Sequence, residues 1–398
     1  MKNSIDYKKI RRASVLLAQS TDVQKNLFLK SLGEKIVRNQ KKILAANARD
    51  IKSAEAKGLE RAFIQRLVLD EKGLRHLAVK VQSVQKLKSG LGETIEKTER
   101  DGLILKKVRV PLGVLAVIYE ARPEVTTDVA SLCVKSGNAA ILKGGSEALA
   151  TNTALYACIR AALKKSGLPE DAVTFITTGD RAVTNEMLTR HDGIDLVIAR
   201  GGYAMVKGVM ERTKIPVLAH SAGGARVYVD KSADLAIAER TLVNAKINKP
   251  SACDSLDTIL VHRAIAKKFI PLITKAMEAE GVTVRRQMDW DEETLSLKVG
   301  IKVVKDADEA IAFIEKHSKK HTEGIVAKDA KVVKRFLNVI DAAALFVNAS
   351  IQLHDGYVFG LGAEMGISTS KLHARGPVGL KELTTYKWEV YGHGNIRQ

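Results

Sequence analysis

Cysteine, aromatic residues and long apolar runs are all scarce in this chain of 398 residues. The three cysteines, Cys133, Cys158 and Cys253, are too few for a disulfide scaffold, and none lies in a Cys/His cluster with metal-ligand spacing. No apolar run approaches the roughly 18 residues of a membrane span, and the first residues contain no apolar stretch typical of a signal sequence. We therefore expect a cytoplasmic protein with no membrane segment and no bound metal.

Acidic residues are also outnumbered, since 45 Asp and Glu face 64 Lys and Arg, a net charge of +19. Such an excess raises the possibility of a nucleic-acid partner. The basic residues are dispersed, however, in pairs such as Lys41-Lys42 and Lys267-Lys268, and aromatics make up only 5% of the chain, too few for a base-stacking platform. We expect solvated helix faces and a field that attracts small anions, with no nucleic acid bound.

The hydrophobic pattern divides the chain, which is long for a single core. Apolar residues such as Leu27, Leu32 and Ile36 recur at helical spacing, which predicts helices over the first hundred residues. Asp101-Gly102 separates two alternating runs within residues 92–110, which predicts a β-hairpin.

Short apolar runs then alternate with helical stretches, which is typical of doubly wound α/β sheets with parallel strands. The first sheet is predicted from strands at 114–119, 139–142, 173–176 and 195–198, with helices near 128–136, 148–165 and 182–189. The second is predicted from strands at 258–261, 301–304, 324–327 and 344–347, with a helix at 306–317.

Two glycine-rich turns follow strands of the first sheet. They are Lys143-Gly144-Gly145-Ser146-Glu147 and Arg200-Gly201-Gly202-Tyr203, each opening a helix. Glycine permits close backbone approach, and a helix N-terminus favours an anion. Neither turn matches G-x-G-x-x-G, so two ordinary tight turns are the alternative to a dinucleotide site.

Cys253 lies in a different setting from the other two cysteines. Its neighbours, Pro250 to Ser255, are typical of a loop, and Lys246 and Lys249 would favour its thiolate. Cys133 and Cys158 lie on apolar helical faces, where a free cysteine acts as a small hydrophobic residue. Cys253 is therefore the candidate nucleophile, with an ordinary loop cysteine as the alternative.

Several longer strings, in order along nearly the whole chain, resemble the gamma-glutamyl phosphate reductase family, a divergent branch of the aldehyde dehydrogenase superfamily. The strings are IYEARP at 118–123, LCVKSGNA at 132–139, KGGSE at 143–147, PSAC at 250–253, VNAS at 347–350, FGLGAE at 359–364 and KLHARGP at 371–377.

The resemblance implies an aldehyde dehydrogenase-like fold in three parts. A Rossmann-type NADP-binding domain would span residues 1–245, and a catalytic domain with the nucleophilic cysteine would span 246–356. Residues 357–398 would form a return segment and a C-terminal strand. The hairpin at 92–110 and that strand would form a small β arm for homo-oligomerisation.

The resemblance also implies the reaction, in which NADPH reduces L-glutamate 5-phosphate to the 5-semialdehyde and phosphate, the second step of proline biosynthesis. Cys253 would form a thioester with the substrate. Glutamate 5-kinase would be a conceivable partner. A related cysteine reductase of another acyl phosphate or an acyl-CoA is the alternative. The implied cofactor contacts are Lys143, Gly144, Ser146, Glu147, Gly201 and Gly202, and the implied substrate contacts are Arg122, Lys246 and Asn348.

Four departures bear on the substrate. The family carries Asn where this chain has Glu124 and Asp254, and Arg where it has Gln352, and the region after Val284 is shortened. Residues 215–224 align with the segment that carries the water-activating glutamate of acid-forming aldehyde dehydrogenases, and they contain no carboxylate. A thioester should then be released by phosphate rather than water, and His220 in this segment is expected to be an ordinary loop residue.

Overall fold

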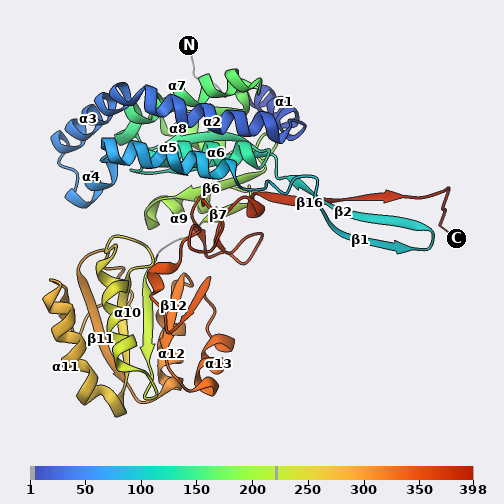
Figure 1. Cartoon of the computed structure of the whole chain (residues 1–398). Helices are drawn as coiled ribbons and strands as arrows, with labels where there is room; N and C mark the ends of the chain where they lie inside the picture. The colour runs from blue at the N-terminus through green and yellow to red at the C-terminus, as the bar shows by residue number, and fades with distance from the viewer. Residues whose placement is uncertain (1–4, 220–222, 398) are drawn as a thin grey trace. The chain divides into compact units, whose positions relative to one another are not determined.

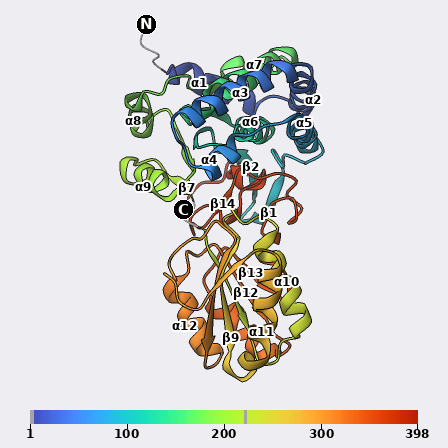
Figure 2. The same ribbon diagram turned by 90° about the vertical axis from the view of Figure 1, so that its left-hand side faces the viewer.

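The structure is a computed structural model that describes residues 5–219 and 223–397. It forms two compact units, each with its own parallel sheet (Figures 1 and 2). Unit 1 contains residues 1–219, 360–366 and 378–398, and unit 2 contains residues 220–359 and 367–377.

Unit 1 begins with five helices, as the hydrophobic spacing predicts. Helix α2 starts at a capping box, in which Thr21 and Gln24 satisfy each other's backbone N–H groups, and it buries Phe28, Leu32 and Ile36 along one face. The helices are α1 (Tyr7–Ala18), α2 (Asp22–Arg38), α3 (Gln40–Ala56), α4 (Arg61–Leu67) and α5 (Glu71–Gln85).

A parallel five-stranded sheet with the order β5-β4-β3-β6-β7 forms the core of unit 1. Every residue of β3 is buried, and its alternate residues Val114, Ala116 and Ile118 pack in the core shared with α1, α8 and α9. Helices α6 and α7 also contact this sheet. The elements are β3 (Val114–Tyr119), α6 (Glu124–Lys135), β4 (Ala139–Gly144), α7 (Leu149–Ser166), β5 (Val173–Phe175), α8 (Arg181–Thr189), β6 (Leu196–Arg200), α9 (Tyr203–Arg212) and β7 (Val217–Ala219). The predicted strands and helices are confirmed.

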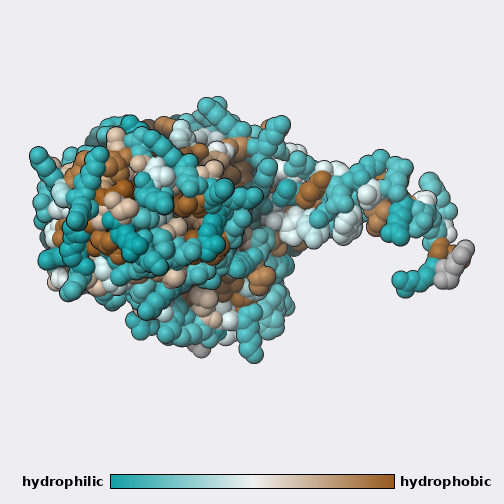
Figure 3. Space-filling view, turned by 90° about the horizontal axis from the view of Figure 1, so that it is seen from below, coloured by the Kyte–Doolittle hydropathy of each residue, from teal (hydrophilic) through white to brown (hydrophobic). Residues whose placement is uncertain are grey.

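The predicted hairpin is also confirmed and extends away from the helices of unit 1 (Figure 1). Strands β1 (Thr94–Arg100) and β2 (Leu103–Pro111) are joined at Asp101 and Gly102, both with positive φ, as a tight two-residue turn requires. Strand β16 (Thr384–Tyr391) pairs with the other edge of β2, as predicted. This three-stranded arm has hydrophilic residues interspersed with apolar ones on its surface (Figure 3), and Trp388 and Tyr391 are about half exposed.

Unit 2 contains a six-stranded sheet with the order β10-β11-β9-β8-β12-β13, and every recorded strand pair in it is parallel. Successive residues of β8 point to opposite faces of the sheet. Val227 packs with α10 and α11, whereas Tyr228 packs with α12 and α13. The sheet is thus covered on both faces. The elements are β8 (Ala225–Val229), α10 (Leu235–Ile247), β9 (Leu256–His262), α11 (Arg263–Ala279), β10 (Thr283–Arg285), β11 (Lys298–Val304), α12 (Ala307–His317), β12 (Thr322–Val326), α13 (Ala330–Val339) and β13 (Ala344–Val347).

The division into units differs from the boundaries expected at residues 245 and 356. Strand β8 and most of α10 precede residue 245, yet they pair and pack with β9 in unit 2. The return segment is shared, since β14 (Ile367–Ser368) and β15 (Gly376–Pro377) lie in unit 2 and the flanking residues lie in unit 1. No composition change marks the points at which the chain passes between the units, so the sequence pattern gives no signal that would move the boundaries implied by the resemblance. Among the described helices, none is long and apolar enough to cross a membrane.

Unit 2 buries two histidines that share one hydroxyl group. Thr322 Oγ1 lies 2.6 Å from His321 Nδ1 and 2.8 Å from His354 Nδ1, and the His354 ring stacks on Phe359. Burial lowers the pKa of His321 to about 4 and that of His354 to about 3. Both imidazoles are therefore neutral in the folded chain at neutral pH.

This pair makes unit 2 sensitive to acid. In the unfolded chain both histidines bind a proton near pH 6.5, whereas the folded chain resists protonation down to about pH 4 or 3. Stability should therefore fall as pH drops below 6.5, by about 1.4 kcal/mol per pH unit for each histidine, and level off below the folded pKa values. We expect His354→Gln to reduce this slope in denaturant unfolding curves between pH 6.5 and 4.5. The exposed His191 supplies the control, and an equal reduction in His191→Gln would contradict the assignment.

Candidate active site

Cys253 lies in the loop between α10 and β9, at the amino end of the sheet of unit 2. Two successive turns shape this loop, because Ala252 N–H donates to Lys249 O at 3.0 Å and Ser255 N–H donates to Ala252 O at 3.0 Å. The carbonyl oxygen of Cys253 accepts the N–H of Gly224 at 2.9 Å. The Cys253 side chain is partly exposed, so its thiol is the one cysteine sulfur here placed for chemistry.

Gly223 packs directly behind the cysteine. A Cβ at this position would overlap the carbonyl oxygen of Cys253 and lie 2.6 Å from its Cα, and it would also overlap the Glu293 carboxylate. Glu293 Oε1 accepts the Gly223 N–H at 3.0 Å. Only glycine therefore permits these three groups to converge. Residues 215–224 contain no carboxylate of their own, but the carboxylate of Glu293 contacts this segment at Gly223.

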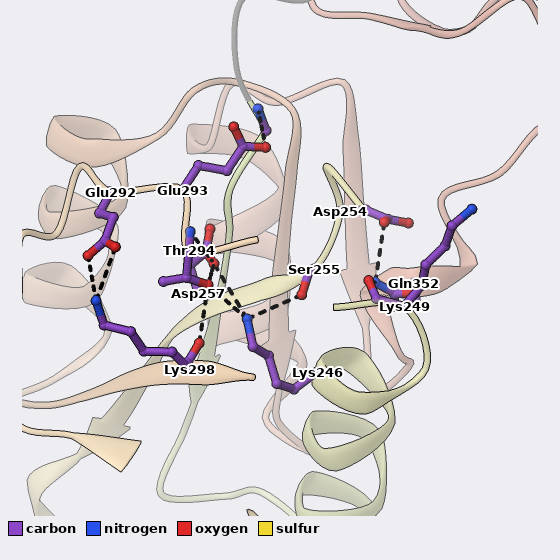
Figure 4. A network of polar contacts seen from close by, with 11 residues as sticks. Lys246, Lys249, Asp254, Ser255, Asp257, Glu292, Glu293, Thr294, Lys298 and Gln352 are labelled. Atoms are coloured by element: carbon purple, nitrogen blue, oxygen red, sulfur yellow. Dashed lines mark hydrogen bonds and ion pairs between the residues drawn. The ribbon is translucent and has the colours of Figure 1, made fainter. Parts of the chain in front are cut away.

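Lys246 is fully buried beneath the same loop (Figure 4). Its Nζ lies 2.9 Å from Thr294 Oγ1, 3.3 Å from Ser255 Oγ and 3.7 Å from Asp257 Oδ1. Burial lowers the pKa of Lys246 to about 8, against the attraction of Asp257. Protein groups thus surround its ammonium, and the substrate contact expected for Lys246 stays a prediction. Lys249 is exposed and lies beside Gln352, away from Lys246 (Figure 4).

Asn348 follows β13 and also bonds to the protein itself. Its Oδ1 accepts the N–H of Ala327 at 2.9 Å, and its Nδ2 donates to the Ala327 carbonyl at 3.0 Å. Its φ of 54° lies in the left-handed region that Asn tolerates better than most residues. These two bonds tie the ends of β12 and β13 together, and the substrate contact expected for Asn348 stays a prediction.

Two of the departures from the family meet in one network (Figure 4). Gln352 Nε2 lies 3.3 Å from both Asp254 Oδ1 and the Lys249 carbonyl, and its Oε1 accepts from Asn248 Nδ2 at 3.1 Å. Gln352 therefore braces the loop that carries Cys253. The Asp254 carboxylate is buried and engaged by Gln352 rather than turned to solvent.

In unit 1 the two glycine-rich turns end strands on either side of β3, since β4 and β6 both pair with β3. Each turn holds a carboxylate. Glu147 Oε1 accepts the N–H of Ala121 at 2.7 Å, and Glu120 Oε2 accepts the N–H of Gly202 at 2.8 Å. A Cβ on Gly145 would overlap Glu147, and a Cβ on Gly201 would overlap Glu120. The glycines thus let anionic oxygens approach the backbone.

The remaining residues of these turns lie close by. Lys143 Nζ donates to the Gly144 carbonyl at 2.9 Å, and burial lowers the pKa of Lys143 while Glu147 raises it. Ser146 opens a short 3-10 helix, η1 (Ser146–Ala148). Gly202 caps α9, and its N–H already binds a carboxylate oxygen, so this N-terminus suits the anionic phosphates of a dinucleotide.

Each unit therefore gathers part of the predicted site. Unit 1 contains the predicted cofactor residues and Arg122, which follows Ala121. Unit 2 contains Cys253 and Lys246, and also Asn348, which follows β13. His220 lies outside the described residues. Within 5–219 and 223–397, no three His, Cys, Asp or Glu side chains form a group able to hold a metal ion.

Five polar residues of these networks were given no role by the sequence interpretation: Glu120, Ser255, Asp257, Glu293 and Thr294. Asp257 carried a visible signal, because it is the one carboxylate in a largely apolar strand that the structure buries throughout. Glu120 and Thr294 carried none, since their roles depend on backbone groups that are distant in sequence.

Comparison with known proteins now identifies the family. Residues 33–295 match the model described as the aldehyde dehydrogenase family. A gamma-glutamyl phosphate reductase of Carboxydothermus hydrogenoformans is 44% identical over 98% of this chain and 98% of its own length. The chain belongs to the gamma-glutamyl phosphate reductase branch of the aldehyde dehydrogenase family.

Solved structures agree with this placement. The gamma-glutamyl phosphate reductase of Thermotoga maritima superposes with a TM-score of 0.95 at 41% identity, covering 98% of this chain and 99% of that one. An acetylating aldehyde dehydrogenase from Geobacillus thermoglucosidasius superposes with a TM-score of 0.73 at 18% identity, covering 98% and 96%. The second match shows the fold alone. The aldehyde dehydrogenase-like fold and the family resemblance predicted from the sequence are thus confirmed.

The burial of the cysteines in this family member leads to a chemical test. Cys133 and Cys158 are at most 3% exposed, and burial raises the pKa of both thiols. Iodoacetamide should therefore label Cys253 first in the native protein, and Cys253→Ser should remain unlabelled until it is unfolded. Peptide mass spectrometry after brief labelling provides the measurement. Labelling of Cys133 or Cys158 as fast as Cys253 would contradict the assignment.

Proposed function

We propose that this chain catalyses the NADPH-dependent reduction of L-glutamate 5-phosphate to L-glutamate 5-semialdehyde and phosphate, the second step of proline biosynthesis, in the cytoplasm. The observation that carries this function is the match to gamma-glutamyl phosphate reductases over 98% of the chain. It is supported by the placement of Cys253, whose partly exposed side chain lies on a loop with a bonded backbone.

Cys253 is the nucleophile of the proposed reaction. Its sulfur forms a bond to the acyl carbon of the substrate while the bond from that carbon to the phosphate oxygen breaks, which gives a thioester and free phosphate. When bound, NADPH supplies the hydride that reduces this thioester. The carbon–sulfur bond then breaks, its electron pair returns to sulfur, and the aldehyde leaves as the Cys253 thiolate is restored.

Unit 1 would hold the cofactor. We assign Lys143 and Glu147, with Gly144 and Ser146, to the adenosine ribose, and Gly201 and Gly202 to the pyrophosphate. The internal carboxylates support this assignment, since Glu120 already occupies the Gly202 N–H as an anionic stand-in. Arg122, beside these turns, is our candidate for the anionic groups of the substrate.

The alternative substrate is another acyl phosphate or an acyl-CoA. This alternative arises because the chain has Gln352 where the family has an arginine, and because Glu124 and Asp254 add negative charge. The structure supports glutamyl phosphate nonetheless, because Gln352 and Asp254 bond to each other rather than oppose a bound anion. Comparing kcat/KM for glutamate semialdehyde plus phosphate with that for simple aldehydes plus coenzyme A distinguishes the two.

We further propose a homo-oligomer assembled through the arm formed by β1, β2 and β16. Half-exposed residues such as Trp388 and Tyr391 on this small sheet, and the unpaired outer edges of β1 and β16, supply a surface for a second copy. A contact with glutamate 5-kinase stays a prediction from the resemblance.

The first test of the proposed function is the reverse reaction. With glutamate semialdehyde and NADP+, NADPH formation should require phosphate, and arsenate should replace it. Without phosphate we expect a rate at least about 100-fold lower, because residues 215–224 carry no water-activating carboxylate. Cys253→Ser should show no turnover under either condition. Rapid phosphate-free oxidation would contradict the proposal and would direct attention to Glu293, whose carboxylate contacts Gly223.

The stand-in role of Glu120 gives a test of cofactor binding that does not depend on turnover. If the pyrophosphate binds at Gly202, Glu120 must release that N–H, so Glu120→Gln should tighten NADPH binding about 3- to 10-fold. Glu147→Gln makes the same charge change at the sister turn, where we assign ribose hydroxyls, and should weaken binding. Titration of NADPH fluorescence gives both dissociation constants. Weaker binding by Glu120→Gln would refute the pyrophosphate assignment, and equal tightening by both variants would reduce it to a general charge effect.

A further inference from the structure

Lys246 has a complete set of partners inside the protein. Its ammonium carries three hydrogens, and three side-chain oxygens surround it, those of Ser255, Asp257 and Thr294. A buried ammonium with no such partners would be strongly destabilising. Burying the Lys246 ammonium therefore costs free energy, and because the side chain is fully buried, contact with solvent cannot be its function.

The three partners come from different parts of unit 2. Asp257 belongs to β9, and Thr294 precedes β11 and bonds to Asp257 through both its hydroxyl, at 2.6 Å, and its N–H, at 3.2 Å. Ser255 belongs to the cysteine loop and lies two residues after Cys253. Lys246 itself lies in the last turn of α10. The ammonium thus joins a helix, a strand and an inter-strand segment to the loop (Figure 4).

Ser255 is the point at which this network reaches the nucleophile. Its N–H closes the turn that begins at Ala252 and encloses Cys253, and its side chain is 2% exposed. On the other side, the Gly224 N–H holds the Cys253 carbonyl. The main chain at Cys253 is therefore restrained from both directions by backbone bonds, and Lys246 anchors one of these restraints through the side chain of Ser255.

We propose that Lys246 is a positioning residue for the reaction, whose buried ammonium fixes the turn that carries Cys253 through Ser255 and does not contact the substrate. This inference rests on the proposed function. Displacing a nucleophile by about 1 Å costs roughly 100-fold in rate, so a restraint two residues away affects the chemical step. A residue that only stabilised the fold would leave kcat unchanged, and one that bound substrate would alter KM.

Ser255→Ala isolates the link to the loop. It removes the hydroxyl that receives Lys246, while Thr294 and Asp257 still surround the ammonium, so the variant should fold. We expect kcat to fall about 10- to 100-fold, with KM for semialdehyde and phosphate within about 2-fold of wild type. NADPH affinity and the melting temperature should change little.

Thr294→Val and Thr294→Ser form a matched pair on the other side of the ammonium. Valine removes the hydroxyl at nearly constant volume, so Thr294→Val should lower kcat. Serine keeps the hydroxyl, so Thr294→Ser should have a kcat near that of the wild type. Lys328→Gln is the control, because Lys328 is an exposed lysine of the same unit whose side chain pairs with Asp234, away from Lys246 and its three partners. It should keep the wild-type kcat.

Steady-state kinetics of all four variants, with thermal melting of each, decide the matter. Wild-type kcat in both Ser255→Ala and Thr294→Val would overturn the positioning role. A raised KM at unchanged kcat would overturn it in favour of a substrate contact. Turnover of the wild type itself reports separately on the proposed function, so the two hypotheses fail independently.

Discussion

The lack of a side chain at Gly223 is the constraint on which the surroundings of Cys253 depend. At this one position the cysteine's backbone, the strand that begins at Ala225 and the carboxylate of Glu293 come together, and no other residue would fit between them. Gly224 then donates its N–H to the Cys253 carbonyl. A loop of turns between α10 and β9 would otherwise have few fixed points, because turns and loops lack the repeated bonds of a sheet. Close backbone packing replaces them here.

Buried charge at the amino edge of the unit 2 sheet completes this arrangement. Arg226 and Glu323 pair at 3.3 Å with at most 1% exposure, and Arg226 also donates to the Trp290 carbonyl at 3.2 Å. Burial raises the pKa of Glu323 to about 7, although Arg226 opposes the shift. Removing one member of such a pair typically costs about 3–5 kcal/mol. Trp290, Glu293 and Thr294 are thus all tied to groups beside or beneath the cysteine loop, so the segment before β11 acts as a bracket for it.

Much of the fold could be predicted because its signals are local. Apolar runs located β3 and β9, and Asp101-Gly102 located the hairpin, since each depends on residues that are adjacent in sequence. The placement of Cys253 in a loop before a strand was predicted for the same reason. The hydrogen bonds that Lys246 and Asn348 make within the protein were not predicted, because a motif match gives a residue's position but not the direction of its side chain. Both point into protein, and the groups that receive them, such as Ala327 and Thr294, are far away along the chain.

The pairing of β16 with β2 has a consequence for how the chain is made. Thr384 pairs with Pro111, so the two strands are separated by 273 positions, the difference between 384 and 111. During synthesis β1 and β2 are made before β16, so one edge of β2 is without its partner until residues 384–391 have also been made. Lys106 and Lys107 lie on this strand, and lysine is the kind of charged residue that disfavours wrong pairing at an exposed strand edge. In the folded chain the ammonium groups of Lys106 and Lys107 lie over the rings of Tyr391 and Tyr386. The charges on the edge of β2 thus become cation–π contacts with β16.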